Sequence, residues 1–296
     1  MKNRRNLYQE VTNRIIEKLE QGVAPWRCTW SKYGMARNVV TGREYNGINR
    51  LLLNLTPNPI PYFMTFNQVK ERGGKVKKGA KANQVFYYNT FYKDENNKTL
   101  SEDEANLFES QGKAVKTKSF LKYYNVFNVD DIDDIGFFFP KTELKENERI
   151  EKCDNIINGM SNAPKLLCEN ADRAYYDFER DIINMPDIMQ FDRSEEYYST
   201  YFHELVHSTG HKSRLAREGI TTESNFGKME YSKEELIAEM GASFLCALTD
   251  IDFSDVTENS ASYIKGWLKV LREDNKFIFN SAAKAQKAVD YILKES

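Results

Sequence analysis

Residues 202–211 read Phe-His-Glu-Leu-Val-His-Ser-Thr-Gly-His, and this stretch decides how the rest of the chain is interpreted. It holds all 3 histidines of the 296-residue chain, His203, His207 and His211. Side chains four residues apart lie on one face of a helix, one turn from each other. Two imidazoles placed in this way can bind one Zn²⁺ through ring nitrogens. The H-E-x-x-H pattern therefore predicts His203 and His207 as metal ligands and Glu204 as the general base for a metal-bound water.

A catalytic zinc site needs a third protein ligand besides the two imidazoles, with water in the fourth position. The sequence E-L-I-A-E at 235–239 places two carboxylates on one helix face. We predict that Glu235 binds the metal and that Glu239 accepts the N–H of a ligand imidazole. Ser232 and Glu235 also have the spacing of a capping box, in which case Glu239 would bind instead. His211 is the remaining alternative, as a ligand or as support for the ligands.

Charge is divided unevenly along the chain. Residues 1–129 carry 22 basic and 11 acidic side chains, and residues 130–296 carry 20 and 33, so the two net charges are +11 and −13. Such asymmetry indicates two domains with different partners. A basic half favours nucleic acid, because lysine and arginine neutralise phosphates. A lysine-rich domain without such a partner is the alternative.

Basic and aromatic residues adjoin one another between positions 70 and 92. Six basic residues lie between Lys70 and Lys81 against one acidic residue, and an aromatic strand follows from position 84. Lysines beside aromatic rings are typical of proteins that bind single-stranded DNA. The predicted DNA-binding residues are Trp26, Trp30, Tyr45, Lys75, Lys77, Lys78 and Lys81, with Tyr87 as a weaker candidate. In the alternative interpretation, the aromatic rings belong to the core and the lysines lie on a solvated turn. The acidic run 130–134 is interpreted as a solvated linker.

Cysteine usage and hydropathy predict the compartment. The 4 cysteines have no C-x-x-C spacing, which favours free thiols in a reducing cytoplasm. No apolar run approaches the roughly 18 residues that a membrane helix needs. The charged, amphipathic N-terminus does not have the apolar segment of a signal peptide. We therefore expect a cytoplasmic protein with no membrane partner.

Seven segments together resemble ArdC-type antirestriction proteins of conjugative plasmids and mobile elements. They are APWRCTW (24–30), NVVTGREYNGIN (38–49), TFNQVKERGGKVKKGAK (65–81), YYNVFNVDDI (123–132), RAYYDFERDIINMP (173–186), YYSTYFHELVHSTGHKSRL (197–215) and EELIAEMGASFLCA (234–247). The E-x-x-A-E helix is also similar to that of gluzincin-type metallopeptidases, which carry E-x-x-A-D or a close variant. Glu239 stands here in place of the aspartate.

The resemblance implies an α+β chain of two domains. A single-stranded-DNA-binding domain would span residues 1–135, a linker 136–145, and a zincin-like metallopeptidase domain 146–296. It also implies protection of incoming DNA from host restriction, and the H-E-x-x-H pattern predicts Zn²⁺ as the cofactor. The alternative is a DNA-associated zinc metalloprotease that cleaves a host protein, with DNA binding serving only to localise it.

Overall fold

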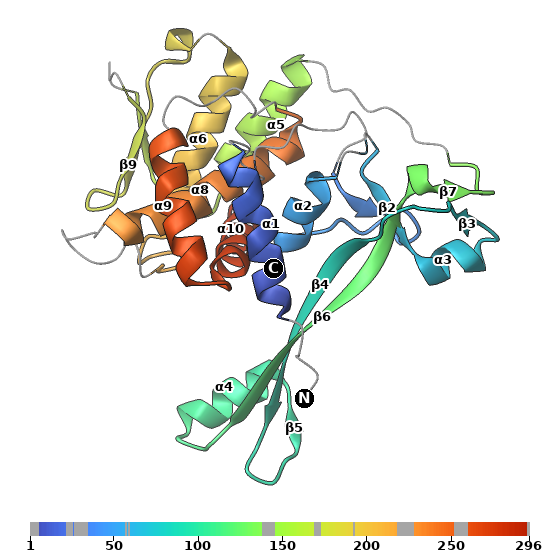
Figure 1. Cartoon of the computed structure of the whole chain (residues 1–296). Coiled ribbons are helices and arrows are strands. Elements are labelled where there is room, and N and C mark those ends of the chain that lie inside the picture. Colours follow the sequence, from blue (N-terminus) through green and yellow to red (C-terminus); the bar gives the residue numbers. More distant parts are fainter. Residues whose placement is uncertain are drawn as a thin grey trace.

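The computed structural model describes residues 6–21, 26, 35–56, 58, 60–137, 146–168, 173–191, 193–217, 228–251 and 260–294 (Figure 1). Strands are long in the N-terminal half, whereas helices dominate the C-terminal half. In this described part of the chain, no helix is long and apolar enough to cross a membrane.

The N-terminal half is built on a five-stranded sheet with the order β1-β2-β6-β4-β5. Its strands are β1 (Arg37–Asn38), β2 (Tyr62–Thr65), β4 (Asn83–Lys93), β5 (Thr99–Leu100) and β6 (Lys116–Asn128). The β1–β2 pair is parallel, and the other pairs are antiparallel. Helix α2 (Ile48–Asn54) is tied to the sheet by Asn49, which exchanges two hydrogen bonds with the backbone of Phe86. Helix α3 (Phe66–Glu71) follows a capping box between Thr65 and Gln68.

Strands β4 and β6 form a ribbon that projects from the body of the molecule (Figure 1). They pair over the whole length of β4, from Asn83 opposite Val126 to Lys93 opposite Lys116. The far end carries β5 and helix α4 (Glu102–Ser110), which begins with a capping box between Ser101 and Glu104. The polar segment 93–118 is thus the folded tip of the ribbon.

The interpretation of the acidic run 130–134 as a solvated linker is wrong. Strand β7 (Ile132–Asp133) pairs with β3 (Lys75–Val76). The Nζ atom of Lys75 lies 3.1 Å from the Asp134 carboxylate, and that of Lys77 lies 3.7 Å from the Asp133 carboxylate. The run therefore neutralises part of the predicted basic turn.

The C-terminal half combines a small sheet with a group of helices. The sheet has the order β8-β10-β9, with β10 parallel to β8 and antiparallel to β9. Its strands are β8 (Lys165–Leu167), β9 (Tyr175–Asp177) and β10 (Ile182–Asn184), and the helices are α5 (Glu146–Gly159), α6 (Ser194–Ser208), α8 (Lys228–Thr249), α9 (Ser260–Glu273) and α10 (Phe277–Leu293).

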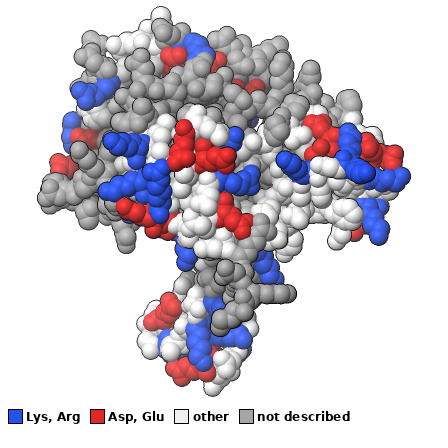
Figure 2. Space-filling model, in the orientation of Figure 1, with Lys and Arg blue, Asp and Glu red and all other residues white. Residues whose placement is uncertain are grey.

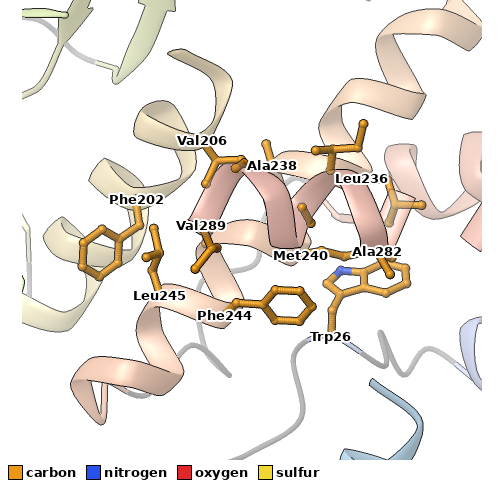
Figure 3. Packing of buried hydrophobic residues seen from close by; sticks show 14 of the residues in the cluster. Trp26, Phe202, Val206, Leu236, Ala238, Met240, Phe244, Leu245, Ala282 and Val289 are labelled. Carbon is orange, nitrogen blue, oxygen red and sulfur yellow. The ribbon is translucent and has the colours of Figure 1, made fainter. Parts of the chain in front are cut away.

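Helix α8 lies at the centre of the core of this half (Figure 3). It packs between α6 and α10, so that Phe202 and Val206 of α6 and Val289 of α10 all belong to one buried cluster with Leu245. Helices α6 and α8 approach each other closely at Gly241, where an added Cβ would lie 2.7 Å from the Val206 side chain. The two helices that carry the histidines and the Glu235 carboxylate are therefore held against each other by close packing.

The N-terminal helix packs on the C-terminal half. Helix α1 (Leu7–Glu20) buries Val11, Ile15 and Leu19 in the same cluster as α8, α9 and α10. The Thr12 hydroxyl donates to the Asn275 carbonyl at 2.8 Å. The Trp26 ring meets Trp267 edge to face at 5.1 Å. This core therefore contains residues from both sides of the predicted boundary at 135.

Candidate metal centre

Helix α6 has one apolar and one polar side. Tyr198, Tyr201, Phe202, Leu205 and Val206 are buried in the core, as the sequence pattern predicts for a helix packed on one face. His203, Glu204 and His207 are partly exposed on the other side. Helix α8 crosses here and brings the buried carboxylate of Glu235 to the two imidazoles.

The three side chains converge through their polar atoms. The Nε2 atoms of His203 and His207 are 3.1 Å apart. One carboxylate oxygen of Glu235 lies 3.5 Å from His203 Nε2, and the other lies 3.3 Å from His207 Nε2. Among the described residues, these three form the group whose ligand atoms could hold one metal ion.

These separations fit a bound divalent metal. Donors at about 2.0–2.1 Å from a tetrahedral zinc ion lie about 3.3–3.4 Å from one another. The three measured separations, 3.1, 3.3 and 3.5 Å, bracket this value. Two imidazole nitrogens that face each other and a carboxylate also require a proton or a cation between them. The donor set therefore suits a divalent cation that leaves a position for water.

The capping-box alternative for Glu235 does not hold in the structure. Helix α8 begins at Lys228, so that Ser232 lies inside the helix instead of at its start. The Ser232 carbonyl accepts a hydrogen bond from the Trp267 indole at 2.8 Å. Glu239 lies one turn beyond Glu235 and is buried, and its role as an imidazole acceptor stays a prediction.

His211 lies outside the group of facing ligand atoms. Its Nδ1 is 2.7 Å from the Ser213 hydroxyl and accepts the backbone N–H of Ser213 at 3.2 Å. The ring packs 5.2 Å from Phe178, and Nδ1 is 4.0 Å from the Asp181 carboxylate. The structure thus places His211 beside the β9–β10 turn, so it does not supply the third ligand.

Glu234 and Arg217 contact the site and were missed in the sequence. A carboxylate oxygen of Glu234 lies 3.5 Å from His207 Nδ1, the ring nitrogen that faces away from the metal position. Arg217 binds the same carboxylate at 2.5 and 3.1 Å. It also donates to the Val206 carbonyl at 2.8 Å and to the Thr209 hydroxyl at 2.5 Å. Arg217 and its three partners Glu234, Val206 and Thr209 are all buried, so this network fixes the end of α6 to α8.

A second arginine holds the other side of the end of α6. Arg214 donates to both oxygens of Asp181, at 2.8 and 2.9 Å, and to the Ser208 carbonyl at 3.0 Å. The Tyr176 hydroxyl donates to Asp181 at 2.7 Å. Cations suit helix C-termini, whose last carbonyls have no partner within the helix. In the sequence, the two arginines that follow the metal helix, Arg214 and Arg217, could have indicated support for its C-terminus. The sequence did not indicate which acidic residues they bind.

The electrostatics of the three facing side chains also favour a cation. Burial lowers the pKa of His207, but the Glu235 and Glu234 carboxylates outweigh it and raise that pKa well above its usual value. Burial raises the pKa of Glu235, but the facing imidazoles of His207 and His203 hold it far below its usual value. The carboxylate therefore stays ionised and attracts positive charge to the space between the rings.

The structure separates the predicted DNA-binding residues. Trp26 is 1% exposed and packs against Trp267, so the prediction that it stacks on bases is wrong. Trp30 lies outside the described residues. Tyr45 is half-buried and packs edge-on to Phe63 at 6.3 Å. Lys75 and Lys77 face the acidic run, whereas Lys78, Lys81 and Tyr87 are exposed.

The two halves match two different families. The profile of a zincin-like metallopeptidase family matches residues 153–284. That of the N-terminal domain of anti-restriction factor ArdC matches residues 5–127. The fold and the site thus define a two-domain protein with a zincin-like metallopeptidase domain, and the predicted α+β class is confirmed.

Solved structures extend the similarity over the whole chain. The metal-free structure of the antirestriction protein ArdC from plasmid R388 is 32% identical, covers 98% of both chains and superimposes with a TM-score of 0.75. Its Mn(II)-bound structure gives a TM-score of 0.74 at the same identity and coverage. The chain belongs to the ArdC family of antirestriction proteins. Its metal site is accordingly one for a divalent ion.

Longer proteins also contain a region similar to this chain. Two proteins of Escherichia coli named DNA primase TraC are 32% and 31% identical over 97% and 99% of this chain. The chain spans only 27% and 20% of their lengths. An uncharacterised protein of Sinorhizobium fredii, y4eC, is 29% identical over 97% of this chain and 91% of its own length.

Proposed function

We propose that this chain is an antirestriction protein of a mobile element that binds single-stranded DNA and holds Zn²⁺ on His203, His207 and Glu235. The observation that carries the proposal is the presence, in one chain, of this ligand geometry and of an ArdC N-terminal domain. The net charge of +11 over residues 1–129 supports a nucleic-acid partner. In this proposal the protein protects incoming DNA from host restriction in the cytoplasm.

Glu204 is the residue that links the metal site to catalysis. It follows His203 on the open side of α6 and is partly exposed. A bound divalent ion would supply Lewis acidity to a water in the fourth position. Glu204 would accept a proton from that water and return it to the leaving amine of a peptide. A site with only a structural role has no need of this carboxylate.

Proteolysis of a host protein is the second candidate function. Strand β9 lies at an edge of the small sheet, beside α6. An edge strand can pair with an extended peptide through backbone hydrogen bonds. Tyr175 on this strand is exposed and available to such a peptide. In this case DNA binding would bring the peptidase to its site of action.

A plasmid-transfer assay into a restricting host separates the two functions. We expect the wild-type protein to raise the number of transconjugants, and Glu204→Gln to protect as well as wild type if shielding of DNA is sufficient. Loss of protection by Glu204→Gln, with metal content and DNA binding unchanged, would assign protection to proteolysis. A wild-type protein that gives no protection would contradict the antirestriction function itself.

A further inference from the structure

The β4–β6 ribbon carries positive charge and no negative charge. Its strands have 11 and 13 residues, and neither contains an aspartate or a glutamate. Four lysines lie on them: Lys93, Lys116, Lys118 and Lys122. Nine of the 24 residues of the two strands are aromatic, whereas aromatic residues make up 13% of the whole chain. The ribbon is therefore a basic and aromatic element that projects from the body of the protein (Figure 1).

The pairing register places all four lysines on one face. Residues directly opposite each other in an antiparallel pair share a face, and successive residues alternate between faces. Tyr87 lies opposite Lys122, Phe91 opposite Lys118, and Lys93 opposite Lys116. We call this face the lysine face. It comprises the four lysines together with Tyr87, Phe91, Phe120 and Tyr124.

The opposite face of the ribbon is packed at its two ends, whereas Tyr88 between them is 58% exposed. At the body end, Phe86 is buried and meets Phe279 of α10 edge to face at 5.7 Å. At the far end, Leu100 of β5 is buried and lies opposite Tyr92. This face carries no lysine between Phe86 and Tyr92 or on the residues opposite them.

The lysine face is open from Tyr87 outward. Tyr87, Phe91 and Tyr124 are 49%, 44% and 53% exposed, although burial of such rings is favourable. At the body end, this face enters the core at Val85 and Val126. The four lysines are exposed as well. Figure 2 shows lysine side chains on the projecting arm, with acidic residues gathered toward its end.

The rings of the lysine face are already arranged as a platform. Phe91 and Phe120 stack across the strands, with centroids 5.1 Å apart and planes at 20°. The Lys122 ammonium lies 4.9 Å from the centre of the Phe120 ring. Cross-strand contacts of this kind stabilise a ribbon by themselves, but they do not explain why every charge on the face is positive.

We propose that the lysine face of the β4–β6 ribbon binds single-stranded DNA. Unpaired bases would stack on Tyr87, Phe91 and Tyr124 while the lysines contact phosphates. The inference rests on the proposed function and assigns it to a surface different from the turn at Lys75–Lys81. At that turn Lys75 and Lys77 lie against carboxylates of the protein, whereas no carboxylate of the two strands competes with DNA on the ribbon.

The test is the affinity of the full chain for a fluorescent oligothymidine, measured by anisotropy at several salt concentrations. We expect Tyr87→Ala with Phe91→Ala to weaken binding at least about fivefold, because stacked bases contribute strongly to such complexes. The matched control is Tyr88→Ala, an adjacent tyrosine on the opposite face that is 58% exposed, which should bind as wild type does. Tyr87→Phe with Phe91→Tyr keeps both rings and should also bind normally.

Charge is tested in the same assay. Lys118→Gln with Lys122→Gln should reduce the steepness of the slope of log affinity against log salt by about 1.4, which is about 0.7 per lost phosphate contact. The control, Lys75→Gln with Lys77→Gln, should leave the slope unchanged. Far-ultraviolet circular dichroism and melting curves identify any variant that fails to fold. If the ring variant does not fold, the lysine pair on the same face decides whether this face binds DNA.

Each outcome separates this inference from the proposed function. If the wild-type protein does not bind oligothymidine, the proposed function fails. If it binds but the lysine-face variants behave like their controls, the surface is overturned and the function stands. Equal binding of duplex DNA, or a loss in the lysine variant without a loss in the ring variant, overturns recognition of unpaired bases. If an acidic peptide does not displace the DNA, a peptide is excluded as the occupant. If that peptide binds more tightly than oligothymidine, the proposal is overturned.

Discussion

His207 lies between two carboxylates that belong to neighbouring residues of α8. Glu235 faces Nε2 at 3.3 Å, and Glu234 faces Nδ1 at 3.5 Å. A carboxylate at the far nitrogen of a ligand imidazole fixes the ring and makes its other nitrogen a better donor to a metal. Consecutive residues on one helix thus serve opposite sides of the same ring. Burial raises the pKa of Glu234, but contacts with His207 and Arg217 outweigh it and hold that pKa below its usual value.

The ligands can be identified by metal content. We expect about one zinc per chain, lost in His203→Ala and His207→Ala and strongly reduced in Glu235→Ala, because each removes one of three converging donors. Glu204→Gln should retain the metal and lose any hydrolysis. Elemental analysis after dialysis measures this. Full zinc in Glu235→Ala together with loss in Glu239→Ala would make Glu239 the ligand.

Replacement of Glu234 tests the support of His207. Glu234→Gln should lower zinc affinity by about 10- to 100-fold, since the imidazole loses its negative acceptor while all three donors remain. Competition with a chromogenic chelator gives the affinity. Glu239→Gln is the matched control on the same helix. If Glu239→Gln has the larger effect, the support of the imidazoles comes from Glu239 as the sequence predicts.

The raised pKa of His207 predicts a pH dependence. In the metal-free protein this pKa lies well above 6.5, so the bound proton stabilises the fold fully below about pH 6.5, and the contribution is lost as pH rises through the raised value. Zinc needs deprotonated imidazoles. The increase in Tm on adding zinc to chelator-treated protein should therefore grow between about pH 6 and pH 8 in calorimetry. An increase that is constant with pH would show that no histidine proton is displaced.

At the scale of elements, the metal site depends on the contact between α6 and α8. Gly241 has no side chain where Val206 approaches, and an added Cβ would lie 2.7 Å from a valine methyl. Valine is β-branched and buried, so it has little freedom to move away. The separation of the two helices in turn sets the distances between Glu235 and the imidazoles.

Gly241→Ala should push the two helices apart. We expect a loss of about 1–3 kcal/mol in unfolding free energy, as for other overpacked cores, although alanine favours helices over glycine. Denaturation in urea, with and without zinc, measures both the stability and its coupling to the site. Val206→Ala in the same background should restore stability, since it removes the clashing methyls. A stable Gly241→Ala variant with normal zinc affinity would contradict the close approach.

The elements differ in how far the sequence predicts them. The spacing of His203 and His207 directly predicts their shared helix face, because it depends only on helix geometry. Trp26 was misassigned, because a tryptophan beside an arginine fits both a stacking group and a core residue, and only tertiary packing decides. The pairing of Lys75 with β7 joins residues almost 60 positions apart, which no local pattern contains. The partners of Arg217 were hidden for the same reason.

At the scale of the whole molecule, the N-terminal helix is part of the core that supports the metal helices. Ile15 of α1 is fully buried in the cluster that also contains Trp267 and Leu236. The Glu20 carboxylate pairs with Arg272 at 2.6 Å, and the Thr12 hydroxyl bonds to the Asn275 carbonyl. The predicted division at residue 135 therefore separates the two family matches, but the buried core includes residues from both sides of it. DNA binding and metal binding are best measured on the full chain.

A substitution in α1 tests this connection. Ile15→Ala should reduce the unfolding free energy by about 2–4 kcal/mol, because it leaves a cavity between α1 and the helices of the C-terminal half. The loss should appear in the same transition that zinc stabilises, although residue 15 is far in sequence from the ligands. Arg14→Ala, an exposed neighbour on the same helix, should change stability little. If Ile15→Ala creates a separate early transition and leaves the zinc-stabilised one unchanged, α1 unfolds independently of the C-terminal half. That result would contradict a shared core.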